Sequence, residues 1–416
     1  MTRRRNVALL VLAVAILSVA VALRWLLDPA RLVPRILSMA GDALGMRITA
    51  EGEGDYRLRG TPQLVARKVV ARDADGGAVI LRAERVFISL PWSTLRARGS
   101  DLIADRLELD GPELDMAAFQ RWQSRRPPSD TSLPTLSRGI GIVRGQIVGS
   151  DWKIEALDAD LQSLAPNRPL RLHLRGRYAG GQLRVPVDVY ASLTKPEAGA
   201  GVGIAGQVTL ESAQWRLPSR IKLSAKLRSE QGIRLDNAVL GAQSRYVTGE
   251  TSLPFALGLA GPLLLSDQTI ALQPAGVSLR GGEMMPTLDA AGGFTFADGL
   301  RLQLDGNLAN WPSAWPALPP PLGQSDSPLP FALAYHGASD LSDVAALTLR
   351  RDQTVFDARF RLFEVLDWSA IGAKGSPLPP LSGSLTTPKL EVSGALLEGV
   401  ELRLEDPAIP PAQASQ

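Results

Sequence analysis

The sequence of 416 residues contains no cysteine and only two histidines, His173 and His336. The lack of cysteine excludes disulfide bonds, cysteine-ligated zinc and thiol nucleophiles. Two histidines cannot build a histidine-rich metal site, and neither has sequence neighbours that suggest a catalytic triad. We therefore expect no catalytic residue, no metal site and no cofactor.

Aromatic residues are scarce, at 5%, so Leu, Val, Ile and Ala must line any core or groove. An excess of one charge is also lacking, because 45 basic residues face 42 acidic ones and the formal net charge is +3. This balance gives no electrostatic reason to expect nucleic acid as a partner. Glycine and proline are plentiful, with 39 and 31 residues, which indicates many turns between short β-elements.

The N-terminus carries an apolar run that follows three arginines at positions 3–5. It includes Val7, Leu17, Leu23, Trp25 and Leu27, and its length matches the roughly 20 residues that span a bilayer. Arginines on the N-terminal side predict that the N-terminus stays inside and the remainder is exported. We expect residues 1–27 to be a single-pass anchor. The alternative is a signal peptide with an A-x-A cleavage site at residues 20–22.

Residues 28–45 are expected to form a short amphipathic capping helix. Asp28 is a candidate N-cap before Pro29, and apolar residues then recur at spacings of three and four. This helix either covers the end of the β-body or lies on the membrane surface.

From residue 54 onward, apolar and polar residues alternate with a period of two, which is typical of strands with one wet face. The apolar members that we select are Val86, Ile88, Leu90, Leu107, Leu109, Leu170, Leu172, Leu174, Leu183, Val185, Val187, Val189, Ile221, Leu223, Leu227, Leu300, Leu302, Leu304, Val400, Leu402 and Leu404. The predicted fold is mainly β, a long antiparallel sheet that either curls into a gutter or closes as stacked sandwiches. In a gutter these side chains stay accessible, whereas in a sandwich they form the core.

Two proline-rich stretches divide this β-body. We expect an N-terminal β-region at 46–124, with a short helix near Met116–Trp122, and a linker at 125–136. A central β-region at 137–310, a second linker at 311–330 and a C-terminal β-region at 331–406 follow. Residues 407–416 are predicted to be a disordered tail.

Two patterns that could carry chemistry have simpler explanations. The G-x-G-x-x-G match at residues 201–206 precedes a strand-like run rather than the helix that a dinucleotide site needs, and we expect a hairpin loop there. The carboxylates Glu108 and Asp110 alternate with Leu107 and Leu109, which places them on the wet face.

The order of these features resembles the AsmA family. The resemblance rests on the N-terminal membrane segment, the short helix after Asp28-Pro29, the strand Leu107-Glu-Leu-Asp-Gly-Pro-Glu-Leu114, and two C-terminal segments beginning at Leu381 and Val392. It covers residues 1–190 and 376–405. Relatives of AsmA and TamB are similar to bridge-like lipid-transfer proteins, which are built as a β-groove with an apolar interior.

The resemblance implies a protein of a Gram-negative inner membrane whose periplasmic body handles phospholipid and supports outer-membrane biogenesis. The selected apolar residues are then the candidates for contact with acyl chains, and each CH₂ kept from water contributes about 0.8 kcal/mol. The alternative is a non-enzymatic assembly factor or scaffold that binds other envelope proteins, for example by strand addition. An envelope enzyme is a third and weaker hypothesis.

Overall fold

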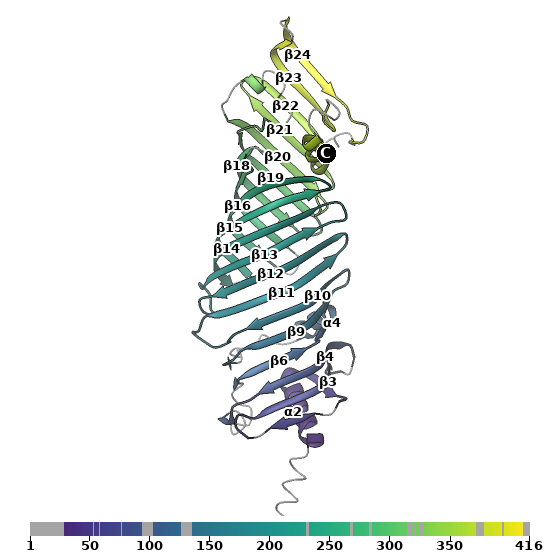
Figure 1. Ribbon diagram of the computed structural model, residues 1–416, viewed down its shortest axis with the longest axis vertical. Helices are drawn as coiled ribbons and strands as arrows, with labels where there is room; N and C mark the ends of the chain where they lie inside the picture. Colours follow the sequence, from purple (N-terminus) through teal and green to yellow (C-terminus); the bar gives the residue numbers. More distant parts are fainter. Residues whose placement is uncertain are drawn as a thin grey trace, which may run out of the picture. The chain divides into compact units, whose positions relative to one another are not determined.

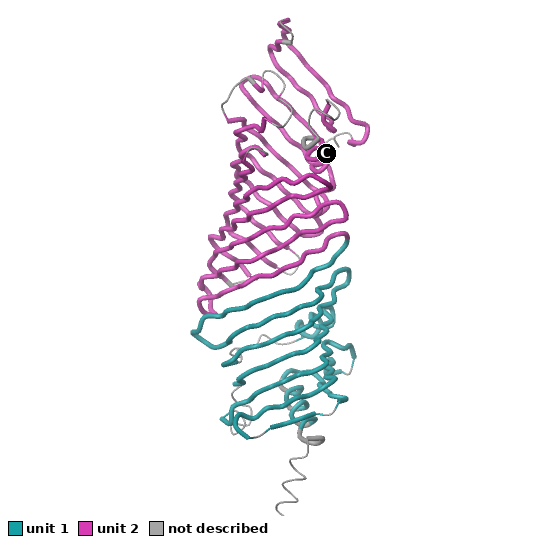
Figure 2. The backbone as a smooth tube through the Cα atoms, in the orientation of Figure 1, with its two compact units in different colours: residues 1–181 teal, residues 182–416 magenta. Residues whose placement is uncertain are grey.

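The computed structural model describes residues 29–410, apart from 53, 58, 76, 94–102, 126–134, 230–232, 267–268, 283–284, 314–317, 319–321, 325–327, 372–377 and 393–394. The chain is mainly β, with 67% of its residues in strands of mostly antiparallel, curled sheet. It divides into two units, residues 1–181 and residues 182–416 (Figure 2). Each unit has its own pattern of covered and uncovered apolar surface.

Unit 1 begins with helix α2, Pro29–Leu44, in the place where the sequence predicts a helix. A short helix, α4, spans Met116–Ser124. The strands of this unit are β1 Met46–Ala50, β2 Asp55–Arg57, β3 Gln63–Asp73, β4 Val79–Ser89, β5 Ile103–Ala104, β6 Arg106–Asp110, β7 Glu113–Asp115, β8 Thr135–Leu136, β9 Ile140–Val148, β10 Trp152–Leu161 and β11 Leu170–Gly180. Strands β1 and β2 both pair with β3, and the sheet continues through β4, then β6 and β7, to β9, β10 and β11.

Unit 2 is an antiparallel meander in which each strand from β12 to β24 pairs with the next (Figure 1). The strands are β12 Leu183–Leu193, β13 Gly201–Glu211, β14 Arg216–Ser229, β15 Ile233–Thr248, β16 Thr251–Leu265, β17 Ile270–Arg280, β18 Thr287–Phe296, β19 Leu300–Ala309, β20 Leu329–Gly337, β21 Val344–Arg351, β22 Thr354–Arg361, β23 Leu381–Val392 and β24 Ala395–Leu404. A 3₁₀ turn, η1, spans Leu322–Gln324, and helix α5 spans Leu362–Ile371.

Helices define an inward face on each sheet. In unit 1, Val33 and Leu37 of α2 are 4% and 3% exposed against Leu64, Val69 and other apolar residues of the first strands. In unit 2, α5 and the segment around η1 lie against the same face of the meander. The face that receives these elements is called inward below, and the opposite face outward.

Several predicted boundaries differ from the structure. Strand β4 ends at Ser89, so Leu90 follows the strand that holds Val86 and Ile88. Gly201 opens strand β13, so the glycines of the G-x-G-x-x-G pattern belong to a strand rather than to a hairpin loop.

Segments predicted as linker or tail also pack on the sheets. Leu322, within the predicted second linker, is fully buried at 0% exposure. Residues 407–410, predicted as part of a disordered tail, lie against the outward face of the C-terminal strands, where Arg359 donates a hydrogen bond to the Pro410 carbonyl and Ile409 is 5% exposed. The first linker lies mostly outside the described residues, and its last two residues form β8.

The described part of the chain begins at Pro29. The predicted anchor, residues 1–27, lies outside it, and between residues 29 and 410 no described helix has the length and apolar character needed to cross a bilayer.

Candidate functional site: an uncovered apolar face

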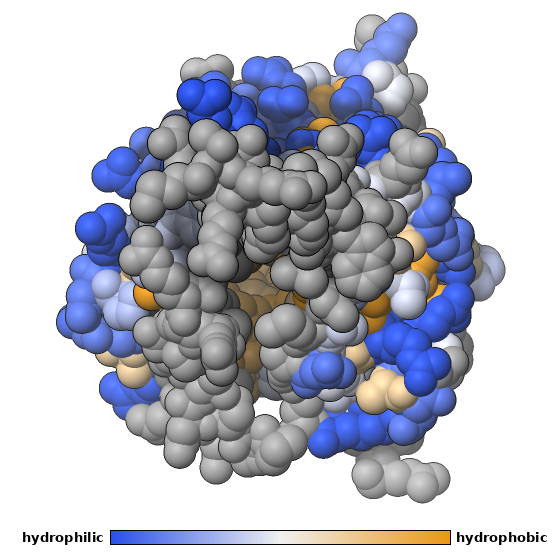
Figure 3. Space-filling model, turned by 90° about the horizontal axis from the view of Figure 1, so that it is seen from below, coloured by the Kyte–Doolittle hydropathy of each residue, from blue (hydrophilic) through white to orange (hydrophobic). Residues whose placement is uncertain are grey.

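The inward face of each unit is apolar, and helices cover only part of it. On β11, Leu170, Leu172 and Leu174 are half-buried, and Leu172 and Leu174 lie opposite Leu161 and Ala159 of β10. Ile154 and Leu157 of β10 in turn face β9 from the same side. In the space-filling view from below, hydrophobic residues are visible towards the middle of the picture and mostly hydrophilic residues lie around them (Figure 3).

Burial separates covered from uncovered parts of this lining. Under α2, Leu64, Val69 and Val86 are 5%, 4% and 8% exposed. Farther along unit 1, every apolar side chain on the inward face of β9, β10 and β11 remains half-buried. A second packed layer would remove such side chains from water, as in a sandwich core. The difference indicates that α2 closes one part of the inward face and leaves the rest accessible.

Unit 2 repeats this arrangement. Exposed and half-buried residues alternate without interruption from Arg216 to Arg228 on β14, with Ile221, Leu223 and Leu227 on the half-buried side. Val187 of β12 faces Val208 of β13, and Leu223 of β14 faces Ile204 of β13. The inward residues of β12–β14 therefore form one apolar surface, in which the alternation predicted from the sequence is reproduced.

Helix α5 covers a limited part of the inward face of unit 2. The ring of Phe363 stacks on Trp215, with centroids 5.1 Å apart, and on Tyr246, with centroids 5.5 Å apart. Trp215 directly precedes β14 and Tyr246 lies on β15, whereas α5 follows β22, so the helix joins parts of the sheet that are far apart in strand order. Burial, and then the charge of Asp367, raises the pKa of Tyr246 to about 12.

Several polar groups on the inward face are paired with one another or with backbone. The hydroxyls of Ser219 and Ser244 are 2.8 Å apart, and those of Thr354 and Thr387 are 3.0 Å apart. Arg351 donates a hydrogen bond to the carbonyl of Leu322, which holds the η1 segment in place. Such pairs remove the cost of burying polar groups, and they offer no convergent donor set for a polar substrate.

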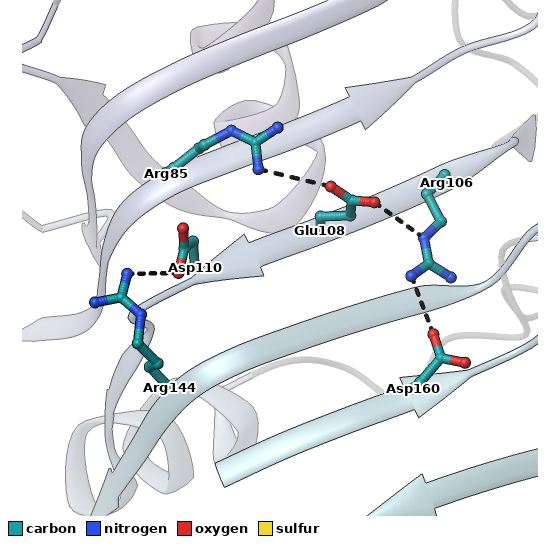
Figure 4. A network of polar contacts seen from close by, with 6 residues as sticks. All are labelled: Arg85, Arg106, Glu108, Asp110, Arg144 and Asp160. Carbon is teal, nitrogen blue, oxygen red and sulfur yellow. Dashed lines mark hydrogen bonds and ion pairs between the residues drawn. The ribbon is translucent and has the colours of Figure 1, made fainter. Parts of the chain in front are cut away.

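Charged side chains in unit 1 lie on the outward face and pair across strands (Figure 4). Glu108 lies between Arg85, at 3.6 Å, and Arg106, at 3.4 Å, and Arg106 also donates to Asp160 at 3.0 Å. Asp110 accepts a hydrogen bond of 2.6 Å from Arg144. The carboxylates predicted for the wet face are therefore bound to arginines of neighbouring strands, and no two of them are arranged as an acid and a base.

No metal site forms within the described ranges, where no group of three or more His, Asp or Glu residues is close enough to hold an ion. His173 lies on the outward side of β11, opposite Asp160.

The selected residues occupy the uncovered surface unequally. Val86 lies under α2, and Leu304 is 5% exposed beneath the η1 segment. Val400, Leu402 and Leu404 lie on β24, where Leu402 is 47% exposed. The sequence reasoning missed α5 entirely, although Leu362, Val365 and Leu366 show the helical spacing that could have revealed it.

Comparison with protein-family models, with curated proteins and with solved structures finds no match to this chain.

Proposed function

We propose that this chain is a non-enzymatic, membrane-anchored protein that handles or transfers phospholipid along its apolar inward face, in the periplasm of a Gram-negative bacterium. The observation that carries the proposal is the half-buried apolar lining of β9–β11 in unit 1, which no described helix covers, and, separately, the part of the β12–β14 lining in unit 2 that lies beyond the contacts of α5. An acyl chain that lies on this lining removes apolar area from water on both partners, at roughly 25 cal/mol per Å². The resemblance to the AsmA family and the N-terminal apolar run supply the proposed location.

The chemistry of the lining suits acyl chains better than polar ligands. Its members are mainly Leu, Ile, Val and Ala side chains, which contact a chain of methylenes without requiring a fixed orientation. Charged groups of these strands point outward, so this part of the inward face carries no ion that would lose hydration when a lipid binds. A surface of this kind favours movement of a lipid over tight retention at one position.

Mass spectrometry of lipids that co-purify with residues 29–416 tests the proposal. We expect bound phospholipid in the unaltered protein and a loss of most of it when Leu172 and Leu174 become Asp. The matched control is Val143→Asp with Val239→Asp, the same chemical change at outward side chains that are 52% and 54% exposed. A folded, lipid-free protein, or equal loss in both variants, would overturn the proposal.

One observation favours a second candidate function, a scaffold for outer-membrane proteins. Strand β24 pairs only with β23 among the described residues, and Leu396 and Leu397 on it are 61% and 47% exposed. A free strand edge with apolar side chains can accept a strand of another protein. In that case Leu396→Lys with Leu397→Lys would abolish association with an unfolded outer-membrane barrel protein and leave bound lipid unchanged.

A further inference from the structure

The outward face of strands β12–β17 in unit 2 is strongly cationic. Strands β12–β17 hold nine Lys and Arg residues against three carboxylates, Asp188, Glu211 and Asp236. All nine cations are exposed. Strand β14 alone contributes five of them and no carboxylate. The nearly balanced charge of the whole chain therefore conceals a local excess of positive charge on one face.

An open depression of about 750 Å³ lies on this outward face, over β13–β17. Arg220, Arg245 and Arg280 are among the residues that line it, together with Gln207 and Gln243. The pairing register explains why these side chains meet. Arg220 is the direct partner of both Gln207 and Gln243 on the neighbouring strands, so the three project from one row of the sheet.

Short side chains keep the depression open. Arg245 faces Pro254 on β16, and Arg280 faces Ala256 across the β16–β17 pair. Pro218, also in the lining, is the partner of Thr209. Proline and alanine between the arginines leave room above the sheet, where larger side chains would fill the space that a ligand needs.

The arginines are only partly neutralised. Arg220 makes no side-chain hydrogen bond or ion pair with any described residue, and Arg245 donates only to the neutral hydroxyl of Ser252, at 3.0 Å. Arg280 is 2.7 Å from Asp289 and also donates to backbone carbonyls. In unit 1, by contrast, arginines such as Arg106 and Arg144 each contact two carboxylates. The depression therefore keeps an excess of positive charge, because one carboxylate, Asp289, faces the three arginines.

We propose that this face binds the phosphate-bearing headgroups of an anionic bilayer. Guanidinium groups form forked hydrogen bonds that match phosphate oxygens, and glutamine amides add neutral donors beside them. The depression is open, and Lys222 and Lys226 extend the positive surface beyond it along β14. An extended array of cations fits a surface that presents many phosphates, in the way that basic clusters bind anionic leaflets. This inference concerns the outward face and does not depend on lipid binding to the inward face.

The test uses the full chain in phosphatidylcholine nanodiscs, which accommodate its apolar N-terminal run. Binding of free vesicles is measured at about 0.1 M salt, with either phosphatidylglycerol mixed into phosphatidylcholine or phosphatidylcholine alone. The site variant carries Arg220→Gln, Arg245→Gln and Arg280→Gln. The control carries Arg47→Gln, Arg171→Gln and Arg301→Gln, which remove the same charge from exposed positions outside the depression. Thermal unfolding verifies that both variants fold.

We expect the unaltered protein to bind vesicles that contain phosphatidylglycerol and not those of phosphatidylcholine alone. The site variant should bind them at least about tenfold more weakly, whereas the control should retain most of its affinity. Equal weakening in both variants would show that net charge alone attracts the vesicles and would overturn the site. Absence of vesicle binding together with binding of inositol hexakisphosphate would assign the arginines to a soluble polyphosphate and would overturn the bilayer as the ligand. The two proposals can be told apart. If the site variant fails to bind vesicles but still co-purifies with lipid, the proposed function of the inward face stands.

Discussion

Single residues on the inward face determine how closely neighbouring strands approach. Gly306 of β19 lies between Ala290 and Phe331 of its partner strands. A Cβ atom added there would be 2.1 Å from the carbonyl oxygen of Asp289 and 2.6 Å from the Cα of Ala290. Because both contacts are with backbone, no side-chain rotation can relieve them. The lack of a side chain at this position therefore allows the sheet to keep its local curvature.

We expect Gly306→Ala to lower the free energy of unfolding by about 1–3 kcal/mol, as overpacking does in other proteins. Gly241→Ala is the control, since nothing lies within 4 Å of an added Cβ at that outward position. Urea denaturation of the two variants measures the difference. Equal stability of the two variants would contradict the close approach.

Tyr246 is a single residue that makes the stability of the fold depend on pH. Burial, and then the charge of Asp367, raises its pKa from 10.0 to about 12. Between these two pH values the folded state keeps a proton that the unfolded state releases. The contribution of Tyr246 to the free energy of unfolding is therefore complete below pH 10 and is lost as the pH rises through about 12. We expect Tyr246→Phe to reduce the loss of stability between pH 10 and 12, whereas Tyr190→Phe, at a side chain 62% exposed, should leave it unchanged. If the free energy of unfolding fell equally between pH 10 and 12 in Tyr246→Phe and in the unaltered protein, Tyr246 would not be the source of this pH dependence.

At the scale of elements, α5 is the described helix that joins distant strands of unit 2. Its residues Leu362 and Val365 pack near β20–β23, and Phe363 and Leu366 pack against Trp215, Tyr246 and Leu253. Acyl chains on the proposed inward path would meet the same apolar surface. The helix is therefore the element whose displacement would enlarge the accessible lining.

Phe363→Ala should weaken the attachment of α5 by about 2 kcal/mol, because it removes two ring contacts and the area they bury. Hydrogen exchange of the α5 amides should become faster in this variant while β14 and β15 stay protected. Glu364→Ala, on the exposed side of the helix, serves as the control. Unchanged exchange in Phe363→Ala would mean that α5 is held by other contacts.

Strand alternation can be predicted from the sequence, whereas bulges and contacts between distant segments cannot. The alternation on β11 and β14 is visible because one strand face stays wet, so its period appears directly in the residue types. Bulges are less visible, and Arg144, Ala156 and Asn237 adopt positive φ angles at positions where the strand register shifts. The cover of the lining by α5 and by η1 depends on contacts between distant segments. Local periodicity carries no information about such contacts.

At the scale of the whole chain, each of the two units has its own apolar inward face, and the units differ in their outward charge. Unit 1 neutralises its charges by cross-strand pairs such as Arg106 with Glu108 and Asp160, which are exposed and contribute little to stability. Unit 2 leaves Arg220 and Arg245 without a carboxylate partner among the described residues, whereas Arg280 pairs with Asp289. We infer a division of roles, in which the inward faces contact acyl chains and the outward face of unit 2 contacts headgroups.

Site-specific photocrosslinking along β11 tests the central claim most directly. A photoreactive phenylalanine analogue is placed in turn at positions 170, 171, 172, 173, 174 and 175 of the full chain in cells, and covalently bound phospholipid is detected after irradiation. The account predicts crosslinks at Leu170, Leu172 and Leu174 and none at Arg171, His173 and Arg175, because only the first set lies on the uncovered inward face. Crosslinks of equal strength at all six positions, or at none of them, would contradict it.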